Sequence, residues 1–271
     1  MKTFPPITPV ILTFNEELNI ERTLNALRWA SRVVIVDSGS TDRTAEIAQS
    51  FRNVDWHTRR FDEHARQWNY AVKETIIDTD WVLALDADMV IPAELLDEMQ
   101  HQFLARSYTG GIVPFTYCCG GRQLFGSLYP PDLRVFRRDA VVIRQDGHTQ
   151  RFSVTGEIYR FKARILHDDR KPLDPWVRAQ LNYSLLEQNR MATTPSGGLK
   201  NLIRKLGLSP AAAGIAAYIR AGGPLKGRAA MQYAYERLTF EALLAMRLLR
   251  EDNREKLARS PAGKLLPSRK H

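Results

Sequence analysis

The sequence has little cysteine and no long apolar run. Its two cysteines among 271 residues, Cys118 and Cys119, are adjacent, and such neighbours make poor partners for an ordinary structural disulfide. No segment reaches the roughly 18 consecutive apolar residues of a membrane-spanning helix. Residues 1–10 lack the basic start, apolar run and small-residue cleavage site of a signal peptide. We therefore expect a reducing compartment and a cytoplasmic protein, attached at most to the inner face of the cell membrane.

The sequence also lacks the short motifs of several enzyme classes. It contains no P-loop, no GxGxxG fingerprint and no His/Cys cluster with zinc spacing. Hydrophobic residues make up 44% and charged residues 25% of the chain. These proportions exclude a disordered tail, a collagen and a disulfide miniprotein, and they fit one large globular domain or one domain with an added module.

The net charge of +9 is located at the C-terminal end. Residues 199–271 contain 15 Lys and Arg against 5 Asp and Glu, whereas the first 198 residues contain 24 against 25. A basic segment of this kind can bind nucleic acid or anionic lipid, or it can simply be solvated by water. The charge alone does not choose among them.

The first hundred residues alternate short β-branched runs with helical patterns. The predicted strands are residues 10–12, 33–36, 54–57 and 81–85, and the predicted helices are residues 17–27, 41–48 (capped by Ser40 or Thr41) and 63–77, with another starting at Pro92. This alternation predicts an α/β fold with a mostly parallel central sheet flanked by helices.

The later part of the chain changes pattern twice. Residues 111–167 read as short strands broken by Gly and Pro, and the chain becomes helical from Pro175. Residues 193–198 resemble a linker. We predict a catalytic domain over residues 1–192, with a donor half of about 1–110 and an acceptor half of about 111–192, and a basic helical extension over 193–271.

Polar residues follow three of the predicted strands. In an open α/β sheet, ligands bind outside the carboxyl ends of the strands, so these positions are candidates for a site. The segments are Thr13-Phe14-Asn15-Glu16, Asp37-Ser38-Gly39-Ser40-Thr41-Asp42 and Asp86-Ala87-Asp88. Each acid has an ordinary explanation as a helix cap, a turn residue or a solvated carboxylate. Their occurrence together at one edge of one sheet favours a functional site.

Asp86 and Asp88 are candidate metal ligands. Residues i and i+2 of an extended chain project to the same side, so both carboxylates can face one cation. Mg²⁺ or Mn²⁺ prefers such oxygen ligands and often shares them with a diphosphate. The sequence therefore predicts a divalent cation at Asp86 and Asp88.

Together the three segments resemble the nucleotide-sugar signatures of the family 2 glycosyltransferases, which have the GT-A fold. The match covers about residues 8–170 and is specific as a set. Among subgroups, the chain is most similar to bacterial enzymes that decorate lipopolysaccharide core and other envelope glycans.

The resemblance implies a role for each donor-site residue. Phe14 is expected near the nucleotide base, Asp37 at the polar edge of that base, Asp86 near the ribose and Asp88 on the metal that bridges the diphosphate. Arg66 lies in a segment that the family places near the phosphates, although a solvated helix arginine explains it equally well. The full donor-binding prediction is Thr13, Phe14, Asn15, Glu16, Asp37, Ser38, Asp42, Arg66, Asp86, Ala87 and Asp88.

The catalytic base is predicted less directly. Family 2 enzymes generally invert the anomeric centre, which requires a carboxylate that removes the proton of the acceptor hydroxyl. The family's motif is often His-Glu or Glu-Asp, whereas this chain reads Asp146-Gly147-His148-Thr149-Gln150. Asp146 is the predicted base because it lies just ahead of the expected motif. Asp132 and Asp169 are its rivals.

The C-terminal extension contains an apolar, Ala-rich segment, residues 208–221, surrounded by basic residues. It is too short to span a bilayer and suits a helix lying at the interface of an anionic membrane. Apolar residues at helical spacing over 228–250 favour packing on the catalytic domain or on a second subunit, so oligomerisation stays open. No nucleic-acid reading motif accompanies the charge, so no nucleic-acid partner is predicted.

We expect an inverting, metal-dependent glycosyltransferase that moves a sugar from a nucleotide-diphosphate sugar to a lipid-linked or envelope glycan, such as lipopolysaccharide core. A polyprenyl-phosphate sugar synthase is an alternative within the same class. A non-catalytic nucleotide-sugar or glycan-binding protein is an alternative from another class. A nucleotidyltransferase would normally carry a glycine-rich basic loop near its start, and residues 5–17 have none.

Overall fold

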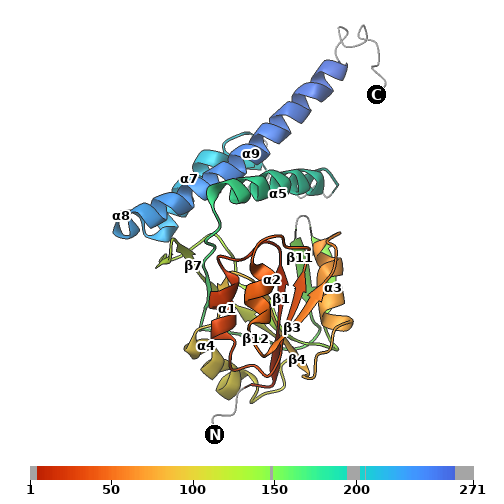
Figure 1. Cartoon of the computed structure of the whole chain (residues 1–271). Coiled ribbons are helices and arrows are strands. Elements are labelled where there is room, and N and C mark those ends of the chain that lie inside the picture. Colours follow the sequence, from red (N-terminus) through yellow and green to blue (C-terminus); the bar gives the residue numbers. More distant parts are fainter. Residues whose placement is uncertain (1–4, 147–148, 194–201, 205, 260–271) are drawn as a thin grey trace.

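A seven-stranded sheet forms the centre of the computed structural model, which describes residues 5–146, 149–193, 202–204 and 206–259 (Figure 1). The strand order is β12-β6-β9-β4-β1-β2-β3. In that order the strands are Ile158–Arg160, Gly110–Val113, Asp132–Arg137, Trp81–Asp86, Ile7–Thr13, Val33–Asp37 and Val54–Thr58. Strands β4, β1, β2 and β3 run parallel, whereas β9 is antiparallel to both β4 and β6. The sheet is therefore mixed.

Both faces of the sheet are buried, which explains why its inner strands are continuously apolar. On β1, Ile11 packs into one core cluster with Leu24 and Phe103, and its neighbour Val10 packs into the other with Trp68. Successive side chains of a strand point to opposite faces, so a strand covered on both sides needs apolar residues at every position. Helices α1, α2, α3 and α4 flank the sheet over Ile20–Ala26, Thr44–Gln49, His64–Lys73 and Ala93–Glu98, and the π-helix η1 follows over Met99–Phe103.

Helix α2 begins later than predicted. It starts at Thr44, because the carboxylate of Asp42 accepts hydrogen bonds from both the backbone N–H and the hydroxyl of Thr44. The predicted cap Ser40 instead donates its hydroxyl proton to Asp37. Residues 38–43 therefore form a loop at the edge of the sheet.

Two smaller sheets complete the α/β part. Strands β5, β13, β7 and β8 pair in that order, over Met89–Val90, Ile165–His167, Phe115–Cys119 and Arg122–Gln123. Strands β10 and β11, over Val142–Asp146 and Thr149–Ser153, form an antiparallel pair beside α3. The four-stranded sheet matters for the site because β13 brings His167 beside the end of β4.

A layer of helices lies across one end of the α/β part (Figure 1). It includes α5 (Leu173–Thr193), α7 (Ser209–Ala221), α8 (Gly223–Lys226) and α9 (Arg228–Arg259), with α5 and α7 both packed on α9. In space, α5 thus lies with the helical layer, although its residues fall inside the segment assigned to the catalytic domain; the boundary near residue 193 stays a prediction. Within the described residues, no helix combines the length and the apolar content needed to cross a membrane.

The helical layer is joined to the α/β part by a shared apolar cluster. Cys119 and Leu124 of the β7–β8 region pack with Ala217 and Ala221 of α7 and with Tyr233 of α9. Both cysteines are buried and unpaired, in agreement with the prediction that they form no disulfide with each other. Burial raises the pKa of the Cys118 thiol to about 11 and that of Cys119 to about 12.

A buried ion-pair network holds the helices of the layer together. Arg204 is almost fully buried, and its guanidinium lies 2.8 Å from a carboxylate oxygen of Glu187 on α5 and 2.6 Å from one of Glu241 on α9. Although burial alone would raise the pKa of Glu187, hydrogen bonds from Arg190 and Arg204 lower it to about 2. Arg204 therefore bridges two helices that are distant in sequence.

Candidate active site

The loops after β1 and β2 are tied together around Asp37. This carboxylate is buried and accepts four hydrogen bonds, from the hydroxyls of Thr13 and Ser40 and from the backbone N–H groups of Gly39 and Ser40. All four donors belong to the edge of the sheet itself. Asp37 thus fixes the shape of the loop, while its predicted contact with a nucleotide base remains a prediction.

Further contacts lock the two loops in register. The side-chain oxygen of Asn15 accepts a hydrogen bond from the backbone N–H of Thr41, and Asn15 adopts a φ of 53°, a left-handed conformation that asparagine tolerates. The backbone N–H of Glu17 donates to Asp42. The ring of Phe14, in the loop directly after β1, is more than half exposed. Phe14 is available as a flat apolar surface for a ligand.

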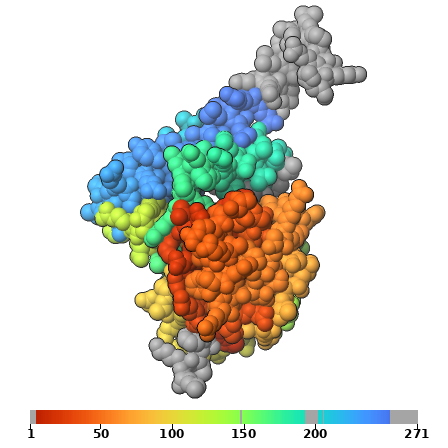
Figure 2. Space-filling model, in the orientation of Figure 1, coloured from red at the N-terminus to blue at the C-terminus, as the bar shows by residue number. Residues whose placement is uncertain are grey.

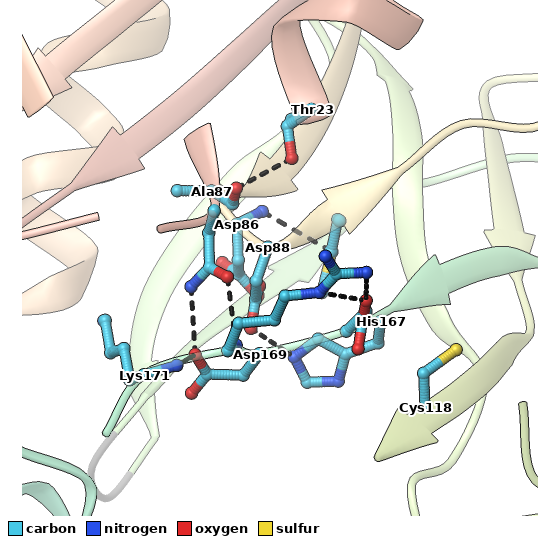
Figure 3. A network of polar contacts seen from close by, with 12 residues as sticks. Thr23, Asp86, Ala87, Asp88, Cys118, His167, Asp169 and Lys171 are labelled. Atoms are coloured by element: carbon cyan, nitrogen blue, oxygen red, sulfur yellow. Dashed lines mark hydrogen bonds and ion pairs between the residues drawn. The ribbon is translucent and has the colours of Figure 1, made fainter. Parts of the chain in front are cut away.

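Asp86, Ala87 and Asp88 do not form the extended pair that the sequence predicted. Strand β4 ends at Asp86 and the next two residues form a turn, held by a hydrogen bond from the Thr23 hydroxyl to the carbonyl oxygen of Ala87. The two carboxylates therefore meet different partners. Asp86 lies 3.5 Å from Arg134. Asp88 lies 3.0 Å from His167 (Figure 3).

Asp88 and His167 form a mostly buried ion pair. Burial would raise the pKa of Asp88, but the charge and hydrogen bond of His167 hold it below its ordinary value. Burial would likewise lower the pKa of His167, but Asp88 raises it above 6.5. The pairing places Nε2 of His167 toward Asp88, and Nδ1 is buried without a hydrogen-bond partner in the described structure.

Glu16 and Lys171 form a second pair beside Asp88. The ammonium of Lys171 contacts one carboxylate oxygen of Glu16, and Asn19 donates to the other at 2.9 Å. Burial, opposed by Lys171 and helped by the charge of Asp88, raises the pKa of Glu16 to about 7. Lys171 itself keeps a raised pKa, because the charges of Glu16, Asp169 and Asp88 outweigh its own desolvation. The positive charge of Lys171 therefore acts on Asp88, whose pKa it helps to lower.

Arg134 is a buried cation between two carboxylates. Its side chain is only 3% exposed and lies 3.5 Å from Asp86 and 3.3 Å from Asp132, with its charge over the ring of Phe115. Its Nε and Nη1 atoms make no hydrogen bond within the described residues. The pKa of nearby Tyr129 is raised to about 12, mainly by burial. The charges of Asp86, Asp88 and Asp132 also raise this pKa, whereas the charge of Arg134 lowers it. Asp132 thus belongs to the same cluster of charges as the two acids of β4.

The other two candidate bases lie in different surroundings. Asp146 ends β10, and its carboxylate contacts the guanidinium of Arg151 across the hairpin. The negative charge of Asp146 contributes to the raised pKa of Arg190 of α5. Asp169 accepts hydrogen bonds from Asn19 and from the backbone N–H of Lys171. Gly147 and His148, through which the motif was aligned, lie outside the described residues.

Within the described residues, Arg66 makes no ion pair with Asp86 or Asp88 and pairs instead with acids near the start of its own helix. It is two-thirds exposed and pairs with Asp62 at 3.7 Å and Glu63 at 3.4 Å. Its neighbour Gln67 is buried, and its amide donates to the hydroxyl of Ser38 and accepts from Arg59. The residue of this helix that contacts the predicted donor loop is therefore Gln67.

A divalent cation fits the site only if a ligand supplies part of its coordination. Within the described residues, no group of three or more His, Cys, Asp or Glu side chains could hold a metal ion. Asp88 and His167 offer one oxygen and one nitrogen donor at the same place. Mg²⁺ and Mn²⁺ accept few protein ligands when phosphate oxygens and water complete the shell.

Sequence reasoning did not single out His167, Lys171 or Asn19 as donor-site residues. His167 ends the short apolar strand β13, so the rule that polar residues after a strand face the site applies to it as well. Lys171 and Asn19 carry no such signal, because only the fold brings Lys171 to Glu16 and Asn19 to Asp169, each across about 150 residues of chain.

The helical layer reaches this site. Burial raises the pKa of Tyr183 of α5, and the negative charges of Asp86, Glu16 and Asp88 raise it further. The pKa of Glu236 of α9 is raised, mainly by burial; the charge of Asp169 also raises it, whereas that of His167 lowers it. The site thus lies between the edge of the sheet and the helices.

Comparisons with known proteins agree with this geometry. A sequence model of the family described as Glycosyl transferase family 2 matches residues 8–164, more than half of the chain. The chain is 32% identical over 106 residues to the lipopolysaccharide core biosynthesis glycosyltransferase LpsC of Rhizobium meliloti, which is 38% of each protein. It is 36% identical over 102 residues to an uncharacterized glycosyltransferase of Rickettsia bellii, covering 37% of this chain and 34% of that protein. The matches therefore span little more than a third of these curated relatives.

A solved structure shares the fold over nearly the whole chain. The crystal structure of S. aureus TarS 1-349 in complex with UDP-GlcNAc superposes with a TM-score of 0.50 and 14% sequence identity, covering 91% of this chain and 92% of that one. At this level of identity the similarity shows the fold alone.

Proposed function

The chain belongs to glycosyl transferase family 2, and from this membership we propose that it transfers a sugar, with inversion, from a nucleoside-diphosphate sugar to a lipid-linked or envelope glycan such as lipopolysaccharide core. The observation that carries the proposal is the gathering of Asp88, His167 and Lys171 at the carboxyl edge of the sheet, where the loop after β1 also exposes the ring of Phe14. The similarity to LpsC supports the acceptor class.

The donor half supplies complementary charge. A divalent cation held by Asp88 and His167 would neutralise charge on the departing nucleoside diphosphate. Lys171 adds a fixed positive charge within reach of the same phosphates, since its pKa stays high. Phe14 offers a surface on which the base stacks, and the bonded loops of Asn15 and Asp37 keep that surface in place.

For the base, the geometry supports Asp132. Its carboxylate is 42% exposed, so an acceptor hydroxyl can reach it, and Arg134 holds it near Asp86. Asp146 remains the prediction made from the sequence, with Asp169 as the other rival. A base acts in the transfer step and adds little to donor affinity.

The first experiment combines a donor screen with a metal test. Purified protein is offered nucleotide sugars, beginning with UDP-GlcNAc, with and without Mg²⁺ or Mn²⁺, and released nucleoside diphosphate is measured. We expect metal-dependent release that Asp88→Ala abolishes and that Asp97→Ala, an exposed acid of α4, leaves unchanged. Metal-dependent release by Asp88→Ala at the wild-type rate would refute the donor site. A sugar found in phosphodiester linkage to a polyprenol would instead identify a polyprenyl-phosphate sugar synthase.

The second experiment compares the three carboxylates. Asp132→Asn should reduce transfer by about 100-fold or more with donor affinity nearly unchanged, because the amide keeps the shape and loses the basic oxygen. Asp146→Asn and Asp169→Asn, assayed in parallel for transfer and by calorimetric donor titration, supply the comparison. If Asp146→Asn alone loses transfer, the base is the residue predicted from the sequence.

A further inference from the structure

Helix α7 has the reverse of the usual arrangement of side chains on a surface helix. Its small residues Gly214, Ala217 and Ala221 are buried, and Gly214 lies against Leu238 of α9. Its large apolar residues face outward, with Ile215 63% and Ile219 70% exposed. Large apolar side chains left in water forgo the free energy that burying them would give. Such a face indicates an apolar occupant.

Two further exposed apolar side chains lie at the α8 end of α7. Leu225 of α8 is 80% exposed, and Phe125, in the loop after β8, is 65% exposed. The backbone N–H of Phe125 donates to the carbonyl oxygen of Ala221, which fixes the loop against the end of α7. We call Ile215, Ile219, Leu225 and Phe125 the α7–α8 face. In Figure 2, the light blue of α7 and α8 and the yellow-green of the neighbouring loop form a lobe at one end of the helical layer.

The stretch of sequence that contains α7 and α8 carries charge of one sign. No Asp or Glu occurs between Glu187 and Glu236 in the sequence. Arg220 and Arg228 are exposed, and the ammonium of Lys226 lies 4.3 Å from the centre of the Phe125 ring. Arg204, from the same acid-free stretch, is buried against Glu187 and Glu241 and is not available to a partner. An apolar face with a cationic rim is complementary to anionic lipid.

We propose that the α7–α8 face docks on the surface of an anionic bilayer, with its four apolar side chains in the headgroup boundary and Arg220, Lys226 and Arg228 against lipid phosphates. A second copy of the chain fits this face less well, because it would bring the same three cations against each other. Docking needs neither the proposed donor nor the proposed acceptor.

The face is also connected to the site. The loop that begins at Phe125 continues to Leu128, whose backbone N–H donates to the Tyr233 hydroxyl at 2.7 Å, and then to Tyr129, whose ring lies 5.2 Å from that of His167. A membrane-borne acceptor would thus be held at the end of a short, anchored loop that leads to the catalytic cluster. This consequence rests on the proposed function, whereas docking does not.

The test uses the full chain and vesicles. Binding to equimolar phosphatidylcholine and phosphatidylglycerol is compared with binding to phosphatidylcholine alone, by cosedimentation. We expect binding to the anionic vesicles that weakens as salt rises from 0.1 M to 1 M, where the screening length falls from about 10 Å to about 3 Å. Ile219→Asp with Leu225→Asp should weaken binding by about tenfold or more, since each side chain loses its apolar burial. The matched control is Ile76→Asp, an exposed isoleucine of the α/β part, which should bind as the wild type does.

Three results would overturn the proposal. The first is no binding to anionic vesicles. The second is wild-type binding by the Ile219→Asp, Leu225→Asp variant, because basic residues elsewhere in the chain would then account for the attraction. The third is a dimer in solution that this variant dissociates, since the face would then cover a second copy. Circular dichroism confirms that the variant is folded, and donor hydrolysis, measured separately, reports on the proposed function.

Discussion

Glu16 is a carboxyl group held within the site beside a lysine and close to a second carboxylate. Its surroundings act in opposite directions: burial and Asp88 favour the protonated form, while Lys171 and Asn19 favour the charged form. Because burial is the largest of these effects, the pKa rises from 4.5 to about 7. The charge of the site therefore changes near neutral pH.

This shift predicts a pH dependence of stability. Between pH 4.5 and about 7 the folded state binds more protons at Glu16 than the unfolded state does, so the free energy of unfolding falls as pH rises through that window. The loss is at most about 3 kcal/mol. In Glu16→Gln this contribution is absent, so wild type should lose stability relative to the variant from pH 4.5 to 7. Chemical denaturation across this range measures the difference.

Glu94→Gln is the control for Glu16, because Glu94 is an exposed acid in the first turn of α4. Its difference from wild type should stay constant from pH 5 to 7. A constant difference for Glu16→Gln as well would show that Glu16 ionises normally in the folded protein.

The acids of the site illustrate what a sequence can predict at the scale of residues. Asp86 and Asp88 were found because they follow a buried strand, and the structure keeps both at the carboxyl edge of the sheet. Their relative orientation was not predictable, because it depends on a turn at Ala87 and on partners more than 40 residues away. Arg134 and His167 are those partners, and only strand pairing brings them there.

At the scale of elements, Arg204 connects α5 and α9 through two buried carboxylates. Arg204→Met should lower the free energy of unfolding by about 3–5 kcal/mol, because it removes the buried cation that pairs with Glu241 and leaves Glu187 with Arg190 alone. Urea denaturation at pH 7 measures this change.

The matched control for Arg204 is an exposed pair of similar geometry. Arg43 lies 2.8 Å from Glu46, and both side chains are about two-thirds exposed. Arg43→Met should leave the free energy of unfolding close to that of the wild type, since water solvates the remaining charge of Glu46. Equal effects of the two substitutions would mean that the Arg204 network is effectively solvated.

The predicted elements were most accurate where burial is two-sided. Strands β1, β2 and β4 read as continuous apolar runs because helices cover both faces of the sheet. The antiparallel direction of β9 was not predictable, since an apolar run in the sequence has no direction. The start of α2 was misplaced because Ser40 and Asp42 are both good capping residues, and only the fold shows that Ser40 is engaged by Asp37.

At the scale of the whole molecule, the helical layer shares an apolar cluster with the α/β part. Cys119 and Leu124 depend on α7 and α9 for their burial. A chain ending at residue 192 should therefore be less soluble and less stable, by at least about 3 kcal/mol, because this surface becomes exposed. Thermal unfolding and size-exclusion chromatography of the two chains measure the effect. A monomeric truncated chain with the wild-type melting temperature would instead favour an independently folded catalytic domain.

The two buried cysteines are chemical probes of how often the helical layer opens. With pKa values of about 11 and 12, Cys118 and Cys119 hold almost no thiolate at neutral pH, and thiolate is the form that attacks a disulfide reagent. Cys119 is covered by residues of α7 and α9, so reagent reaches it only when those helices separate from the α/β part. The rate at which Cys119 of the unmodified protein reacts with a disulfide reagent would therefore measure how often α7 and α9 separate from the α/β part.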